Sequence, residues 1–171
     1  FYFTIFVWIK LKFCANIYIR WNMKPNLVVV GFENEFNKKL CIYLADKLDM
    51  FFVDVKELIE YDLVNSKEAL LRCGKEYIEK EERKTVRNVS EYENTVVNIP
   101  YDLFVNNRDF FKNNNINIFI KPFKVDDIDM LVMEDRIALL KNDCKIFIEN
   151  SENSVESCYN KIITKLKGDN R

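Results

Sequence analysis

The stretch from Gly31 to Lys38 follows an apolar run and precedes a helical pattern, which is where phosphate-binding loops occur. Leu27–Val30 is apolar and largely β-branched, as a buried parallel strand should be. A phosphate-binding loop reads G-x-x-x-x-G-K-[ST], because glycine lets backbone N–H groups converge on the anion and lysine adds a cation. The stretch here reads GFENEFNK, so only its first glycine matches. By itself it is no evidence for such a loop, and the case depends on the rest of the chain.

Aligned on that pattern, the stretch has several substitutions that oppose a bound nucleotide. Phe36 occupies the second glycine position, where its Cβ restricts the backbone, and Asn37 replaces the lysine. Lys38 replaces the Ser or Thr that would bind Mg²⁺, and Glu33 and Glu35 add negative charge. Hydrogen bonds to charged groups are worth about 1.5–3 kcal/mol each, so these changes together oppose ATP strongly. The nucleotide-loop positions are Gly31, Asn34, Phe36, Asn37, Lys38 and Lys39.

Lys38 and Lys39 are the alternative cations in this region. One residue along a helix turns a side chain by about 100°, so neither replaces the missing lysine unless the loop is remodelled. We expect both side chains to be solvated at the start of a helix.

The composition excludes several classes of function. The chain has 171 residues, enough for one domain, and its net charge of −1 gives no pull towards nucleic acid or an anionic membrane. It contains no histidine, which excludes Ser-His and Cys-His dyads and histidine-ligated metals, and we predict no metal site. Its five cysteines form no C-x-x-C pair, so we expect reduced structural thiols in a cytoplasmic protein.

The segment 1–22 differs from the rest of the chain. Its longest apolar run, Phe1–Ile9, is far shorter than the roughly 20 residues that span a bilayer, and its charges follow that run, unlike those of a signal peptide. We expect the natural protein to start at Met23, with 1–22 as a non-native upstream extension and 23–171 as one domain. The alternative is an N-terminal appendage that packs on the domain.

From Asn26 onwards, short apolar runs alternate with helical patterns. We predict strands at 27–30, 50–53, 95–99, 116–120 and 145–148. We predict helices over 40–48, 55–61, 67–89, 102–113 and 126–142, and a last one capped by Ser154. This order predicts an α/β fold in which helices cover both faces of a parallel sheet.

Several segments, in this order, resemble the shikimate kinase family. The run NLVVVGF at 26–32 resembles that family's opening strand, and LADKLDMFFVD at 44–54 resembles its first helix leading into an F-x-D-x-D strand. ELIE at 57–60, GKEY at 74–77 with Glu81, and 145–166 resemble later segments of the family. The resemblance covers Asn26 to about Lys167. It implies a three-layer P-loop kinase fold with a five-stranded parallel sheet, and a transfer of the ATP γ-phosphoryl group, with Mg²⁺, to the 3-hydroxyl of shikimate.

The positions at which that family holds shikimate also differ in this chain. Asp54 matches the first acid of the family's pair, but Lys56 stands where the second should face the substrate. Ile78 stands at the arginine of the G-E-x-x-F-R-x-x-E segment, so a carboxylate clamp is missing. Glu81 matches the family's glutamate and equally suits a solvated helix face.

Differences also follow the third predicted strand. Pro100 and Tyr101 stand where the family has a Gly-Gly-Gly run; proline has no N–H, and the tyrosine ring would fill space that a ligand needs. Arg136 resembles the arginine of the family's R-x-P-L segment, but without its partners we expect a surface or ion-paired arginine.

We therefore expect a shikimate-kinase-like fold retained without its chemistry, which acts by binding, with an unidentified protein as partner and no cofactor. The substitutions fall on ligand positions while the apolar pattern persists, and random decay would damage both. One alternative is an active shikimate kinase that uses ATP and Mg²⁺ with a remodelled loop. The other is a protein for a changed small ligand, in a pocket lined by Lys56, Glu33 and Tyr101.

Overall fold

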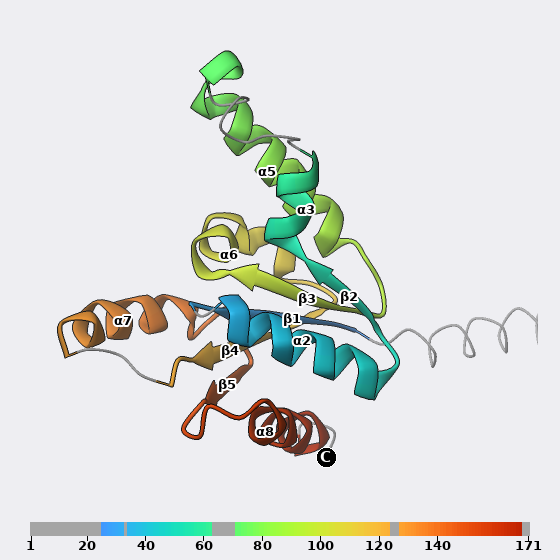
Figure 1. Ribbon diagram of the computed structural model, residues 1–171, viewed down its shortest axis with the longest axis vertical. Helices are drawn as coiled ribbons and strands as arrows, with labels where there is room; N and C mark the ends of the chain where they lie inside the picture. Colours follow the sequence, from blue (N-terminus) through green and yellow to red (C-terminus); the bar gives the residue numbers. More distant parts are fainter. Residues whose placement is uncertain (1–24, 33, 63–70, 124–126, 169–171) are drawn as a thin grey trace, which may run out of the picture.

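The sheet has five parallel strands in the order β2-β3-β1-β4-β5 (Figure 1). A computed structural model describes residues 25–32, 34–62, 71–123 and 127–168, so the segment 1–22 lies outside the described residues. The strands are β1 (Asn26–Gly31), β2 (Phe51–Asp54), β3 (Thr95–Pro100), β4 (Asn115–Lys121) and β5 (Ile146–Glu149). The predicted α/β fold with a five-stranded parallel sheet is confirmed.

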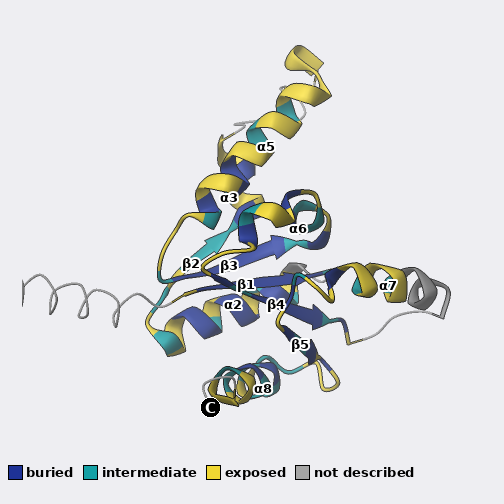
Figure 2. Ribbon diagram, turned by 180° about the vertical axis from the view of Figure 1, so that it is seen from behind, coloured by how far each residue is buried: buried dark blue, intermediate teal, exposed yellow. Residues whose placement is uncertain are grey.

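Helices cover both faces of this sheet. They are α2 (Asn34–Leu48), α3 (Val55–Asp62), α5 (Lys75–Ser90), α6 (Tyr101–Asn107), the 3₁₀ turn η1 (Arg108–Phe111), α7 (Asp127–Leu140) and α8 (Val155–Gly168). Leu27 and Val29 of β1 pack with α2 and α8 in one core cluster, and Val28 and Val30 pack with α3, α5 and α6 in the other. This alternation follows from the two-residue period of a strand. Figure 2 shows the buried strands between helices that expose their outer faces.

Three helix boundaries differ from the sequence prediction. The helix predicted over 40–48 begins earlier, since α2 starts at Asn34 and so includes the second half of the stretch from Gly31 to Lys38. The helix predicted over 67–89 is interrupted at Gly74, whose φ of 81° does not continue a helix, and α5 begins at Lys75. Residues 63–70 lie outside the described part. The helix predicted over 102–113 ends at Asn107 and continues only as η1. The predicted cap of the last helix is present, since the Ser157 N–H donates to Ser154 Oγ at 3.2 Å.

The described helices also bear on membrane association. None of the helices within the described ranges is long and apolar enough to cross a bilayer.

Candidate functional site

The carboxyl ends of β1 and β3 lie side by side, because Gly31 pairs with Pro100 in the parallel register. Open α/β sheets bind ligands outside this edge, at the point where the strand order reverses. That point is β1 here, since β3 lies on one side of it and β4 on the other. The fold thus places the predicted loop and the start of α6 at the edge where such proteins bind ligands.

The side chain of Asn37 is buried and packs against Gly31. Its side chain is 1% exposed, and its amide lies so close to Gly31 that a Cβ on that glycine would overlap it. Its Oδ1 has no hydrogen-bond partner among the described residues. The residue at the lysine position of the pattern therefore belongs to the packing between α2 and the sheet.

Lys38 extends in another direction, from α2 to α3. Its ammonium group is hydrogen-bonded and ion-paired with the carboxylate of Glu57, and this contact raises the pKa of Lys38. We predicted a solvated side chain here, so the ion pair is a difference from the sequence analysis. Lys39 and Glu35 are exposed, while Phe36 packs against the core cluster of α2 and α8. Glu33 and the side chain of Asn34 lie outside the described part.

Asp54 uses both carboxylate oxygens in contacts within the protein. Oδ1 accepts the Glu57 N–H at 3.0 Å, which caps the start of α3, and Oδ2 accepts the Asn98 side-chain amide at 2.7 Å. Lys56 is exposed on α3, with its Nζ 4.0 Å from Glu60 Oε1. The sequence analysis missed Asn98, although a buried amide within the apolar run TVVNIP was a signal that it has a specific partner.

Tyr101 and Phe32 form a stacked aromatic pair at this edge. Their ring centroids are 4.7 Å apart, and the Tyr101 hydroxyl donates to the Arg136 carbonyl oxygen at 3.3 Å. Tyr101 is only 6% exposed, and burial raises its pKa. Pro100 lies directly before α6, so Tyr101 is the first residue of that helix.

Arg136 covers the aromatic pair from α7. Its guanidinium carbon lies 5.6 Å from the Phe32 ring centroid and 5.4 Å from that of Tyr101, within the range of a cation–π contact. The residue is exposed, and no ion pair joins it to another described residue. Phe32 was missed in the sequence analysis, although an aromatic residue directly after the loop glycine is the signal that could have identified it.

Ile78 and Glu81 lie on α5, which extends away from the sheet (Figure 1). Ile78 is half-buried, and Glu81 is ion-paired with Lys84 at 3.2 Å. Within the described ranges, no hydrogen bond or ion pair joins either residue to Asp54 or Arg136. The structure thus separates these two predicted substrate positions from the Phe32–Tyr101 pair.

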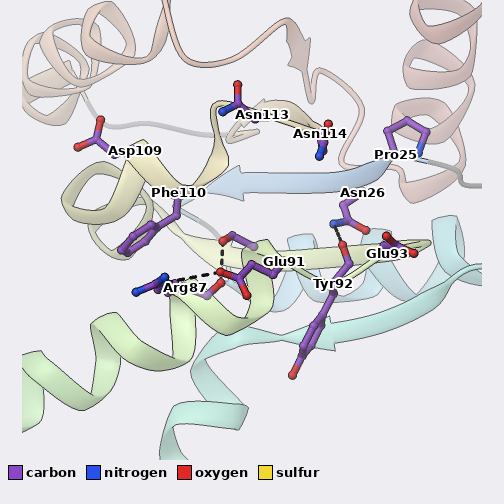
Figure 3. A pocket seen from close by; sticks show the side chains of 11 residues that line it. Pro25, Asn26, Arg87, Glu91, Tyr92, Glu93, Asp109, Phe110, Asn113 and Asn114 are labelled. Atoms are coloured by element: carbon purple, nitrogen blue, oxygen red, sulfur yellow. Dashed lines mark hydrogen bonds and ion pairs between the residues drawn. The ribbon is translucent and has the colours of Figure 1, made fainter.

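A polar hollow of about 740 Å³ lies at the opposite, amino-terminal edge of the sheet (Figure 3). It is lined by the end of α5, the loop into β3, η1 and the start of β1. Most of its charged residues are paired, since Arg87 contacts Glu91 at 3.5 Å and Asp109 contacts Lys112 at 2.6 Å, whereas no ion pair joins Glu93 to another described residue. Across the described segments, no cluster of acidic or cysteine residues could hold a metal ion.

The sequence matches a model of the shikimate kinase family over residues 39–170. The chain belongs to the shikimate kinase family. The match begins at Lys39, directly after the stretch from Gly31 to Lys38. No curated protein matches the sequence.

Solved structures show the same fold as this shikimate kinase family member. A shikimate kinase from Aquifex aeolicus vf5 is 21% identical, with a TM-score of 0.70, and the match covers 84% of this chain and 97% of the other. For a shikimate kinase from Acinetobacter baumannii in complex with shikimate, the identity is 16%, the TM-score 0.69 and the coverage 85% and 94%. A gluconokinase from Sinorhizobium meliloti 1021 is 10% identical, with a TM-score of 0.54 and coverage of 84% and 92%.

Proposed function

We propose that this member of the shikimate kinase family does not transfer phosphoryl groups and acts by binding. The observation that carries the proposal is the burial of Asn37 against Gly31, at the position where the phosphate-binding pattern requires lysine. A neutral, buried side chain supplies no charge to a triphosphate, and the family depends on such a cation for positioning and electrostatic stabilisation.

The neighbouring contacts support the absence of ATP and Mg²⁺. Lys38, the nearest alternative cation, is already paired with Glu57. Asp54 accepts hydrogen bonds from the Asn98 side chain and from the start of α3, which accounts for its place in the structure without a bound ion. The described side chains of this region therefore do not fit a nucleotide with its metal.

The space after β3, where a phosphoryl acceptor would have to bind, supports the same proposal. Tyr101 fills the space after β3 with a ring that is stacked on Phe32 and covered by Arg136. Opening that space would separate the buried Tyr101 ring from the partly buried Phe32 ring, and such an aromatic pair is worth about 0.5–1.5 kcal/mol beyond its area. A second substrate would need this cost to be offset by new contacts.

The intact core favours a retained binding role over simple decay. Both faces of the sheet keep fully buried apolar side chains, among them Val28 and Leu40, while the substitutions fall on ligand positions. We propose a protein as the partner, because a net charge of −1 offers no general attraction for nucleic acid or an anionic membrane.

Titration calorimetry and thermal unfolding of the full chain with Mg-ATP and shikimate test this proposal. We expect no binding heat and no change in melting temperature at millimolar ligand. An active shikimate kinase measured in parallel should show a higher melting temperature with the same ligands. An upward shift for this chain, or ADP release above background in a coupled assay, would overturn the proposal. Loss of such turnover in Lys38→Ala would then identify Lys38 as the replacement cation.

A further inference from the structure

We draw no further inference here: the strongest candidate, the polar hollow at the amino-terminal edge of the sheet, is lined by exposed carboxylates such as those of Glu93 and Asp109, and none of the described residues that line it is both buried and unpartnered, so nothing in the described part of the chain points to a ligand for it.

Discussion

The side-chain amide of Asn37 fills the space beside the α-carbon of Gly31 in which a Cβ would have to lie. Gly31 is not in the left-handed region, so its lack of a side chain matters here for space and not for backbone conformation. A glycine that a phosphate-binding loop needs for its turn is thus used in this chain to accommodate an asparagine.

This contact predicts a strong coupling between the two positions. Gly31→Ala should lower the free energy of unfolding by about 1–3 kcal/mol, because the buried Asn37 side chain has little room to move. In an Asn37→Ala background the same change should cost less than about 0.5 kcal/mol, since the overlap is then removed. Urea unfolding of the four proteins gives the coupling energy, and additive effects would show that the two residues do not compete for this space.

The stacking of Tyr101 on Phe32 predicts that Tyr101 stabilises the fold. Tyr101→Ala should lower the free energy of unfolding by about 3 kcal/mol, because it empties a buried site and leaves Phe32 without its stacking partner. Tyr92→Ala, at a tyrosine that is 42% exposed, is the matched control and should cost less than about 1 kcal/mol. Equal effects of the two substitutions in chemical unfolding would count against the packing role of Tyr101.

The Lys38–Glu57 contact predicts a pH dependence at the alkaline end. Glu57 raises the pKa of Lys38, so the pair's contribution to stability is complete below the ordinary lysine value of about 10.4 and is lost as the pH rises through the raised value. Glu57→Gln should therefore lower the pKa of Lys38, measured by NMR titration of its side-chain ammonium. Glu60→Gln, beside Lys56, should leave it unchanged. An unaltered Lys38 titration in Glu57→Gln would mean that the two side chains do not interact in solution.

The sheet could be predicted from the sequence because its strands carry strong local signals. Runs such as Leu27–Val30 and 95–99 are apolar and β-branched, and they are buried on both faces as such runs require. Helix limits were less accurate, because the charge pattern over 67–89 continues across Gly74 while the backbone does not. The charge pattern indicates which face of the helix is polar, but it does not indicate that Gly74 adopts a positive φ.

The candidate site depends on contacts that no local pattern specifies. Phe32 meets Tyr101 only because β1 and β3 are neighbours in the sheet, and Arg136 reaches both rings from a helix much later in the chain. Asn37 is a polar residue near the start of a helix, where solvent exposure is the ordinary expectation, yet it is buried. That residue 37 is an asparagine could be read from the sequence, whereas its burial against Gly31 could not.

The cysteines predict a distinct pattern of chemical reactivity. Burial raises the pKa of Cys144 to about 12 and raises that of Cys41 well above its usual value, whereas Cys73 is exposed. Since the thiolate is the reactive form, iodoacetamide at mildly alkaline pH should modify Cys73 in the folded protein and reach Cys41 and Cys144 only after unfolding. Peptide mass spectrometry before and after addition of urea measures this order, and Cys73→Ser removes the early modification as a control.

The raised pKa of Cys144 also affects how stability depends on pH. A thiol whose pKa is higher in the folded state contributes stability that is complete below the unfolded value of about 8.5 and declines as the pH rises towards the folded one. Cys144→Ala should therefore lessen the loss of stability between those two pH values, although it lowers stability at neutral pH by leaving a small cavity. If Cys144 instead reacted as fast as Cys73 in the folded chain, its side chain would have to be accessible, and the packing of Cys144 beside Leu140 in the core would be wrong.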